Sequence, residues 1–522
     1  MIMVDNKFKV LITTSGIGSR LGELTDYTNK SLVRIGDKPA ISLIIEKYPE
    51  DTEFVITLGH YGDYVKEFLR MVYPNRVFSF VPVGNYDGPG SSLGYSILQA
   101  KESLQCPFIF NACDTLFETR EVINQCLRSV RNFCVGEKRE DSSQYATMLC
   151  DSEKIIQIKE KGELNYDFAY VGLCGIVDYK LFWKSLEECY VNNRGSSLYE
   201  GDAINQMLPQ TTFELIESKD WLDMGNVGEL EKTRTHFSSF AHVLEKKEET
   251  IYFYEDFVVK FFSNEKINKN RIERAKKLTG LVPPIIQGGN NFYKYKKVSG
   301  QLLAESINPE KFKNLLQWSK KNLWIKKECK NFKNLCKKFY IEKTRNRIKD
   351  FLKNCEKEQD FVNYIRIQKA GELLDSIDHD WLCSGIPVQF HGDFILDNIL
   401  ETSAEFCLLD WRQDFGGNLE IGDIYYDLAK LNHNLTISHE IVNKKLFNSD
   451  PENCYILCNS KLIKCKEILK KFIILEGFDY RKVQILTSLI WINMAPLHEY
   501  PFNKFLFNFG KQTLQELIDE KD

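Results

Sequence analysis

The sequence predicts an α/β protein with two domains, the first built on a mostly parallel sheet and the second of the α+β type. Three observations support this prediction. Short apolar segments alternate with helical patterns along the first half, a glycine-rich turn follows the first apolar segment, and strand-like segments at residues 250–262 precede a long helical region. A chain of 522 residues is also too long for one hydrophobic core.

The composition is that of an ordinary globular protein and argues against several classes of function. Apolar residues make up 43% of the chain and charged residues 27%, and the net charge of -4 gives no general attraction to nucleic acid or anionic membranes. The 15 cysteines are scattered without a CxxC pair, as is usual for reduced thiols. No secretory segment or long apolar run is present. We therefore expect a cytoplasmic protein that acts on small molecules, without nucleic-acid partners or membrane insertion; homo-oligomer formation stays open.

The first apolar segment, residues 8–14, runs into the glycine-rich sequence SGIGSRLGELT. A buried strand that ends in a glycine turn is a common start of nucleotide-binding α/β folds, because backbone amides beside glycine can approach phosphate oxygens. We expect Gly16, Gly18 and Ser19 to contact a nucleotide. A dinucleotide-binding turn is the alternative, but the third glycine and the later acid of that fingerprint are missing.

Residues 16–39 resemble the signature of nucleotidyltransferases for sugar phosphates and phosphocholine, which runs roughly GxGxRLxxLTxxxPKxLxxxxGKP. The matching residues are Gly16, Gly18, Arg20, Leu21, Leu24, Thr25, Lys30, Leu32, Gly36, Lys38 and Pro39. Ser15 and Asn29 depart from it, where a smaller residue and proline are usual. The resemblance implies a Rossmann-like nucleotidyltransferase domain over residues 1–242.

Later segments fit the same resemblance in the same order along the chain. DGPGSSL would form a second nucleotide-binding loop, with Gly90, Ser91 and Ser92. Asp114, at the end of FIFNACD, and Asp223, in WLDMG, resemble the two metal ligands of the family. The alternative for Asp114 is a helix N-cap.

The resemblance also indicates residues on the acceptor side. Glu160 and Lys161, in EKG, lie near a segment whose lysine meets the acceptor phosphate, and Gly172 follows on the next strand. Glu200, in SLYEGD, would contact substrate hydroxyls, although an exposed acid at a helix start is the alternative.

The reaction implied is nucleotidyl transfer from a nucleoside triphosphate to a phosphate monoester. The monoester oxygen attacks the α-phosphorus and pyrophosphate leaves, with Mg²⁺ held by Asp114 and Asp223. Arg20 would stabilise the triphosphate, and Lys30 and Lys161 would neutralise the two anions that must meet.

The second domain, residues 243–522, is indicated by HGDFILDN at residues 391–398 and by Asp410 after the strand-like run that follows. Phosphoryl transfer from ATP needs a carboxylate beside the attacking hydroxyl and oxygen ligands for Mg²⁺. Asp393 would be the base, and Asn398 and Asp410 the ligands. The pattern resembles small-molecule kinases of the protein-kinase-like superfamily, such as aminoglycoside phosphotransferases and choline kinases. An ordinary polar turn is the alternative.

That resemblance implies an N-lobe near residues 250–300 and a C-lobe near 301–522. Lys260 resembles the strand lysine that meets the ATP phosphates, and Glu273 its partner on the following helix. The alternatives are a solvating lysine on an edge strand and a surface charge on the helix. No glycine-rich loop precedes Lys260. Asp427, in a GDxxxDLA segment, would brace the catalytic loop. The aromatic tail would form either core or a box for a quaternary ammonium group; its candidate residues are Trp491, Tyr500, Phe502 and Phe505.

Together the two resemblances predict a bifunctional enzyme. The C-terminal domain would phosphorylate a small hydroxyl compound with ATP, and the N-terminal domain would couple the product to a second nucleotide, with a marginal preference for CTP. The product would be a CDP-alcohol, a CDP-choline-like compound or a nucleotide sugar for surface polysaccharide synthesis. The alternatives are a sugar 1-kinase joined to a sugar-1-phosphate uridylyl-, thymidylyl- or guanylyltransferase, and a nucleotide-sensing pseudoenzyme or scaffold.

Overall fold

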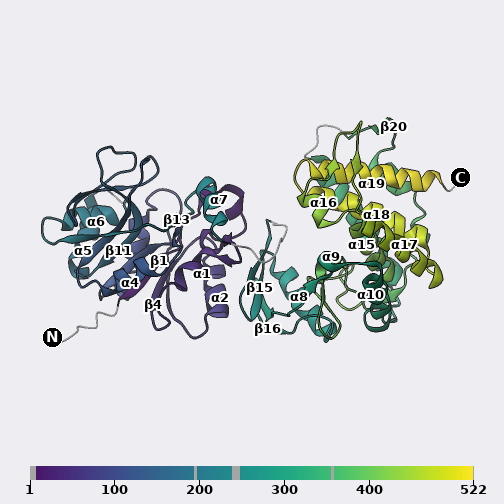
Figure 1. Ribbon diagram of the computed structural model, residues 1–522, viewed down its shortest axis with the longest axis horizontal. Coiled ribbons are helices and arrows are strands. Elements are labelled where there is room, and N and C mark those ends of the chain that lie inside the picture. The colour runs from purple at the N-terminus through teal and green to yellow at the C-terminus, as the bar shows by residue number, and fades with distance from the viewer. Residues whose placement is uncertain (1–7, 193–196, 238–246, 354–357, 521–522) are drawn as a thin grey trace. The chain divides into compact units, whose positions relative to one another are not determined.

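The computed structural model describes residues 8–192, 197–237, 247–353 and 358–520, and the chain divides into two compact units (Figure 1). Unit 1 comprises Met1–Glu265 and Gln287–Lys294, and unit 2 comprises Lys266–Ile286 and Tyr295–Asp522. The predicted boundary near residue 242 lies outside the described residues. Strands β14 (Glu249–Phe253) and β15 (Phe257–Phe262), which were expected to open the second domain, group with unit 1.

Unit 1 is built on a nine-stranded sheet in the order β5-β4-β1-β6-β11-β8-β12-β10-β9. The strands in this order are Val77–Pro82, Glu53–Leu58, Lys9–Thr13, Phe108–Ala112, Phe168–Ile176, Asn132–Glu137, Phe213–Glu217, Lys154–Lys159 and Thr147–Asp151. β5, β4, β1 and β6 run parallel, but β11 is antiparallel to both β6 and β8. Strands β8 and β12 also pair in parallel, whereas β10 is antiparallel to both β12 and β9. The sheet is therefore mixed, and the predicted parallel arrangement holds for the first four strands and for the β8–β12 pair.

Helices cover both faces of this sheet. Successive side chains of a strand point to opposite faces, so neighbouring residues of β1 pack in different clusters. Val10 and Ile12 of β1 belong to one buried cluster and Leu11 to another. Helices α2 (Gly62–Val72) and α4 (Glu121–Arg128) pack in the first cluster. Helices α3, α5 and α6 pack in the second and span Leu93–Gln99, Tyr179–Asn192 and Glu200–Met207. The remaining helices of this unit are α1 (Ala40–Ile45) and α7 (Val227–Thr235).

The antiparallel pair β14 and β15 is joined to the core of unit 1 by aromatic packing. Phe68 of α2 contacts the rings of Tyr252 and Phe292, with centroids 5.4 and 5.7 Å apart. The Tyr252 hydroxyl donates a hydrogen bond of 2.7 Å to the carbonyl of Leu32. A strand pair that buries its aromatic face in this way is an integral part of the first unit.

Unit 2 is mainly helical. Its main helices are α8 (Glu265–Lys277, from Lys266 on), α10 (Pro309–Asn322), α12 (Lys343–Lys353), α15 (Ile424–Thr436), α17 (Ser460–Leu475), α18 (Tyr480–Met494) and α19 (Phe502–Asp519). A small sheet, β18-β22-β23, consists of Gln301–Leu302, Ile399–Glu401 and Phe406–Leu408, and its last two strands follow the 391–398 loop. A two-lobed kinase-like architecture stays a prediction.

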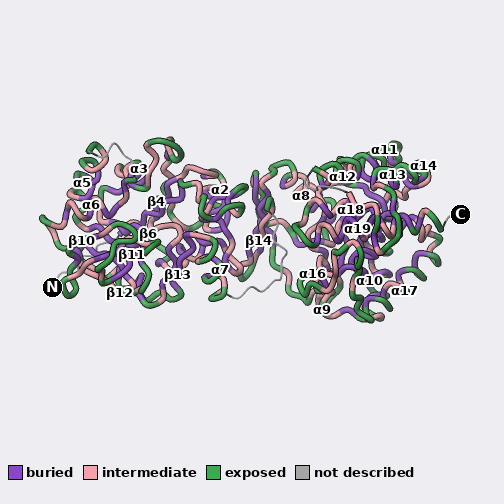
Figure 2. The backbone as a smooth tube through the Cα atoms, turned by 90° about the horizontal axis from the view of Figure 1, so that it is seen from above, coloured by how far each residue is buried: buried purple, intermediate pink, exposed green. Residues whose placement is uncertain are grey.

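Helices α15 and α18 form the centre of unit 2. Every residue of α15 is buried, and so are ten residues of α18, as the purple trace of α18 shows (Figure 2). Trp491 and Phe505 are core residues with 3% and 0% exposure, whereas Tyr500 is exposed. Phe502 is also buried, with 8% exposure, and its ring lies 6.1 Å from that of Phe505, so three of the four candidate residues belong to the core. Among the described residues, none of the helices combines the length and the hydropathy needed to span a bilayer.

Candidate active sites

The glycine-rich loop of unit 1 requires glycine at residue 18. Gly18 has a φ of 75°, and a Cβ there would lie 3.0 Å from the Cβ of Lys30 and 3.1 Å from Cγ2 of Thr25. The 3₁₀ segment Ser19–Thr25 begins directly after it. The buried Asn29, which replaces the usual proline, donates hydrogen bonds of 2.8 and 2.6 Å to the carbonyls of Thr14 and His60. Asn29 therefore departs from the signature but anchors the same loop through these two hydrogen bonds.

The structure brings Asp114, Asp223 and Lys30 together at one end of the sheet. Asp114 follows β6, and Asp223 ends β13 (Trp221–Asp223). The ammonium of Lys30 is ion-paired with the carboxylate of Asp114. Gly225 lies between the two acids, because a Cβ there would be 3.1 Å from Oδ1 of Asp223 and 3.7 Å from Oδ2 of Asp114. Asp223 also accepts hydrogen bonds from the Gly225 N–H and from Tyr145, at 2.8 and 3.1 Å.

The electrostatics of this cluster favour an added cation. Burial raises the pKa of Asp223, and repulsion from Asp114 raises it further. Burial also acts to raise the pKa of Asp114, but the Lys30 ammonium outweighs it and the net pKa is lowered. Burial acts to lower the pKa of Lys30, and the attraction of Asp114 outweighs it, so that the net pKa is raised. Two carboxylates that share one ammonium supply the hard oxygen ligands that Mg²⁺ prefers.

The charges of Arg20 and Lys161 also interact with those of this cluster. Partial burial and the charge of Arg20 lower the pKa of Lys161, while Asp114 and Asp223 act to raise it. The charges of three cations, Arg20, Lys30 and Lys161, therefore act on this cluster, as binding of a triphosphate and a phosphate monoester would require.

The second predicted nucleotide loop precedes α3. Gly90 has a φ of 83°, and the Ser91 hydroxyl donates a hydrogen bond of 2.7 Å to the carbonyl of Gly88. Ser92 is the N-cap of α3 and accepts a hydrogen bond of 3.0 Å from the N–H of Tyr95. Gly16 lies in the first loop, where a Cβ would meet nothing within 4 Å.

The three predicted acceptor-side residues have different environments. Gly172, with a φ of 79°, lies in an irregular part of β11, where a Cβ would be 3.1 Å from that of Ala112. Glu160 is exposed. Glu200 begins α6 with only 3% exposure, so it is not the exposed acid of the alternative interpretation. Its Oε2 is buried without a hydrogen-bond partner in the described residues, and burial raises the pKa of Glu200 to about 7.

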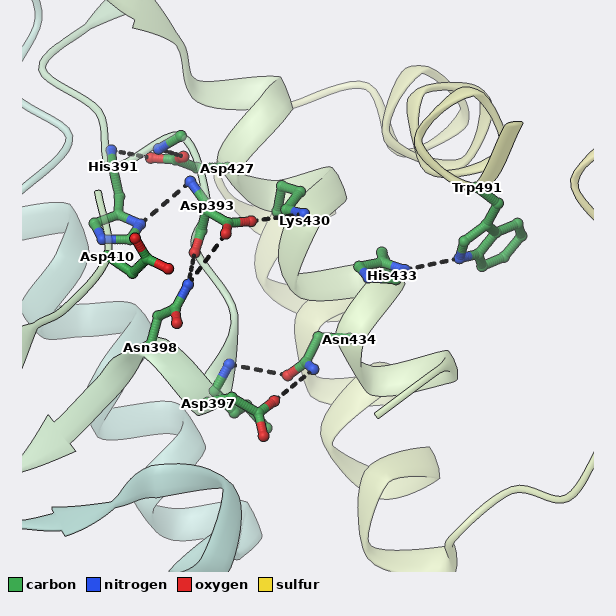
Figure 3. A network of polar contacts seen from close by, with 12 residues as sticks. His391, Asp393, Asp397, Asn398, Asp410, Asp427, Lys430, His433, Asn434 and Trp491 are labelled. Atoms are coloured by element: carbon green, nitrogen blue, oxygen red, sulfur yellow. Dashed lines mark hydrogen bonds and ion pairs between the residues drawn. The ribbon is translucent and has the colours of Figure 1, made fainter. Parts of the chain in front are cut away.

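In unit 2, the loop at residues 391–398 is held by helix α15 (Figure 3). The buried carboxylate of Asp427 accepts hydrogen bonds from the N–H groups of His391 and Gly392, at 2.9 and 2.7 Å, and from Nε1 of Trp324 at 3.1 Å. Burial raises the pKa of Asp427 to about 6 despite these bonds. Asp427 therefore holds the 391–398 loop in place, as expected from the sequence.

His391 orients the same loop from the other side. Burial lowers the pKa of His391 to about 4, so the imidazole is neutral near pH 7. Nε2 lies 2.8 Å from the carbonyl oxygen of Leu409 and therefore carries the proton. Nδ1 accepts the N–H of Asp393 at 3.2 Å. The imidazole thus connects the predicted base to the residue that precedes Asp410.

Asp393, Asn398 and Asp410 lie close together, as Figure 3 shows. Nδ2 of Asn398 donates to the carbonyl of Asp393 at 2.9 Å and to its carboxylate at 3.2 Å. The other amide atom of Asn398, Oδ1, accepts no hydrogen bond from the described residues and could ligate a cation. Asp410 is ion-paired with Arg271 of α8. An amide oxygen and a carboxylate beside a base fit Mg²⁺, although three or more His, Cys, Asp or Glu side chains do not gather as a metal site anywhere in the described residues.

The two nucleotide-binding residues predicted from the kinase pattern lie on β15 and α8. Lys260 is buried on β15, with 8% exposure. Glu273 lies on the outer face of α8, where its carboxylate is 2.7 Å from the ammonium of Lys276 and its side chain is 44% exposed. Glu273 therefore pairs with Lys276, whereas the predicted partner was Lys260.

Sequence reasoning missed three polar residues of α15, of which two, Lys430 and Asn434, face the loop and one, His433, faces Trp491 (Figure 3). The Lys430 ammonium lies 2.7 Å from a carboxylate oxygen of Asp393. Asn434 accepts the N–H of Leu396 at 2.9 Å and donates to Asp397. His433 accepts a hydrogen bond of 2.8 Å from Trp491. Polar residues three to four positions apart in a buried helix were the signal that could have revealed this face.

Comparison with known proteins finds relatives for the N-terminal part of the chain. No family model matches the chain. A stretch of 218 residues, 41% of this chain, is 26% identical to the bifunctional protein GlmU of Methanocaldococcus jannaschii and covers 50% of that protein. A stretch of 117 residues, 21% of this chain, is 29% identical to the choline-phosphate cytidylyltransferase of Streptococcus pneumoniae and covers 46% of it. The chain thus spans about half the length of these curated relatives.

Among solved structures, the CTP:phosphocholine cytidylyltransferase of Streptococcus pneumoniae aligns with 44% of this chain and 98% of its own, with 20% identity and a TM-score of 0.37. The sequence matches confirm the predicted resemblance for one part of the chain. The N-terminal part of this protein resembles nucleotidyltransferases.

Proposed function

We propose that this protein catalyses two consecutive reactions. Unit 2 transfers the γ-phosphoryl group of ATP to a hydroxyl of a small acceptor. Unit 1 then couples the phosphorylated product to the nucleotidyl group of a second triphosphate, preferably CTP, and releases pyrophosphate. The observation that carries this proposal is the convergence of Asp114, Asp223 and Lys30 in the part of the chain that resembles nucleotidyltransferases.

For nucleotidyl transfer, the charges of unit 1 bring two anions together. An oxygen of the phosphate monoester forms a bond to the α-phosphorus, and the bond from that phosphorus to the β-phosphate breaks. Arg20, Lys30 and Lys161 offset the negative charge of both reactants. Mg²⁺ held by Asp114 and Asp223 would supply further charge stabilisation.

For phosphoryl transfer, Asp393 accepts the proton of the acceptor hydroxyl as its oxygen bonds to the γ-phosphorus, and ADP leaves. Asp427 and His391 hold the loop in place through the hydrogen bonds described above. Asn398 and Asp410 would hold Mg²⁺, which supplies charge stabilisation on the phosphates.

The product of the two steps is a nucleoside diphosphate linked to an alcohol or a sugar, a class of activated donor for polysaccharide synthesis. The preference for CTP is supported by the match to a choline-phosphate cytidylyltransferase. Each half-reaction has its own leaving product, which allows the two to be measured separately.

The test uses the full chain with Mg²⁺ and measures ADP and pyrophosphate independently. ATP is offered with a panel of alcohols, polyols and sugars, and CTP, UTP, dTTP, GTP and ATP are offered with the corresponding phosphate monoesters. The proposal predicts ADP in the first series and pyrophosphate, greatest with CTP, in the second. No pyrophosphate with any pair would contradict the role of unit 1, and no ADP with any acceptor would contradict that of unit 2.

A further inference from the structure

Positively charged side chains gather beside the loop that carries Asp393. The ammonium of Lys343 lies 4.4 Å from the ring centroid of Phe339, and the guanidinium carbon of Arg412 lies 4.8 Å from the same ring. Arg412 also lies against the loop itself, because a Cβ on Gly392 would be 2.6 Å from the Cβ of Arg412. Arg412 therefore lies against the loop that carries the predicted base, and Lys343 contacts the same aromatic ring as Arg412.

Two further cations belong to this group, which we call the basic cluster: Lys343, Arg347, Arg412 and Lys430. Burial lowers the pKa of Lys343, and the positive charges of Arg412, Arg347 and Lys430 lower it further. Lys430 is the member that contacts Asp393 directly.

The carboxylates near Lys343 and Arg412 are engaged elsewhere. Asp393 is ion-paired with Lys430, and Asp410 with Arg271. Asp414 is the carboxylate that attracts Lys343, and it also accepts the N–H of Gly417 at 2.9 Å. Across the described residues, Lys343 and Arg412 form no ion pair with any carboxylate, and Nε of Arg412 is buried without a hydrogen-bond partner.

Lys343 and Arg412 are partly buried, and a partly buried cation without a paired carboxylate is costly unless a ligand supplies the opposite charge. Lys343 also follows directly on the π-helical segment Lys337–Glu342, a rare conformation that occurs frequently at functional sites. The basic cluster therefore has the character of a binding site for an anion.

We infer that the hydroxyl compound phosphorylated by unit 2 carries an anionic group, a carboxylate or a phosphate, which Arg412 and Lys343 bind. This inference rests on the proposed kinase activity. A guanidinium can bind either anion through two parallel hydrogen bonds, and the ammonium adds a point charge. A cationic acceptor such as choline would instead add a positive charge to the four already present.

The first test compares acceptors that differ in charge but share a hydroxyl. ADP formation is measured with the full chain, ATP and Mg²⁺, using glycerol, glycerate, glycerol phosphate, ethanolamine and choline. Glycerate or glycerol phosphate should have a kcat/KM at least about tenfold above that of glycerol, as expected for a charge-assisted hydrogen bond. Choline and ethanolamine should be the poorest substrates. Preference for choline, ethanolamine or glycerol would overturn the inference.

The second test asks whether the basic cluster binds the anionic acceptor or ATP. Arg412→Ala and Lys343→Gln should raise KM for the anionic acceptor about 10- to 100-fold with little change in KM for ATP. Arg412→Lys should restore part of the affinity. Lys338→Ala, an exposed lysine of the same π-helical segment, is the matched control and should not change either KM. An increase in KM for ATP alone would assign the cluster to the nucleotide and overturn the inference.

A third measurement separates failure of the inference from failure of the kinase function. Binding of glycerate and of inorganic phosphate to the full chain is followed by calorimetry. If no acceptor yields ADP but an anion binds and Arg412→Ala abolishes the binding, the kinase function fails while the anion site stands. If neither anion binds and no acceptor yields ADP, both are contradicted.

Discussion

The ammonium of Lys430 lies 2.7 Å from a carboxylate oxygen of Asp393, and this contact connects helix α15 to the predicted catalytic loop. The Lys430 side chain is 10% exposed and that of Asp393 is 28% exposed, so water screens the pair only partly. A cation held beside the base can orient its carboxylate and offset the charge of the transferred phosphoryl group.

Lys430→Met should therefore lower ADP formation by about 10- to 1000-fold, because it removes a cation aimed at the reacting groups while keeping a chain of similar length. Lys430→Arg should retain more activity than Lys430→Met. The measurement is kcat for ADP formation with the best acceptor of the panel. Unchanged kcat in Lys430→Met would show that the contact is only structural.

Asp427→Asn should have an effect on unit 2 alone. An amide presents an NH₂ group where Asp427 accepts three N–H donors, so at least one of these hydrogen bonds is replaced by a contact between donors. We expect ADP formation to fall by about 100-fold or more and the stability of unit 2 to fall by about 1 to 3 kcal/mol. Pyrophosphate release by unit 1 should stay near the wild-type rate, and its loss would argue against two independent sites.

Gly18→Ala should damage the nucleotidyl-transfer site. The new Cβ would lie 3.0 Å from the Cβ of Lys30, in a residue whose φ of 75° is unfavourable for alanine by about 1 to 2 kcal/mol. Because Lys30 is paired with Asp114, its displacement should lower pyrophosphate release more than it lowers stability. Gly84→Ala is the matched control, since a Cβ at Gly84 meets nothing within 4 Å. Equal activity of the two variants would contradict this prediction.

Glu200 should make the stability of unit 1 depend on pH. Its pKa is raised from the ordinary value of 4.5 to about 7, so between these pH values the folded state holds a proton that the unfolded chain has lost. Stability should therefore fall as the pH rises from about 5 to 7 and then level off, by at most about 3 kcal/mol.

The matched variant for this prediction is Glu200→Gln, which cannot ionise. It should be more stable than the wild type at pH 8 and similar to it at pH 5, in unfolding experiments followed by circular dichroism. Glu153→Gln, at an exposed position, should follow the wild type. Parallel pH profiles for the wild type and Glu200→Gln would contradict a raised pKa.

The sequence predicts best those site residues that directly follow a strand. Asp114 and Asp223 each end a strand-like segment, and the structure places both carboxylates around Gly225. Strand direction was less predictable. Apolar periodicity identified β11, but it contains no information on direction, and this strand runs antiparallel to its neighbours.

The contacts of helices were hardest to predict, because they depend on which face meets the rest of the fold. Glu273 was expected to point inward, yet Arg271, two residues earlier, is the side chain that reaches Asp410. Two residues correspond to about 200° of rotation around a helix, so a small difference in orientation exchanges the two faces. Lys430 was missed for a similar reason, since its contact joins segments far apart in the chain.

The domain boundary shows a related difficulty. The charged stretch before residue 250 reads as a linker, and the strands after it were assigned to the second domain. Their aromatic residues, such as Tyr252, instead pack on Phe68 of unit 1. Strand patterns reveal an apolar face but not the surface that this face will cover.

The most direct test of the account is to separate the two activities by single substitutions. Asp393→Asn and Asp114→Asn are assayed in the full chain for ADP and for pyrophosphate, with Asp380→Asn and Asp151→Asn as exposed controls. The account predicts that Asp393→Asn loses ADP formation but still releases pyrophosphate when supplied with the phosphorylated acceptor, and that Asp114→Asn shows the reverse. Retention of both products in either variant, or loss of both in each, would contradict two separate catalytic sites in this chain.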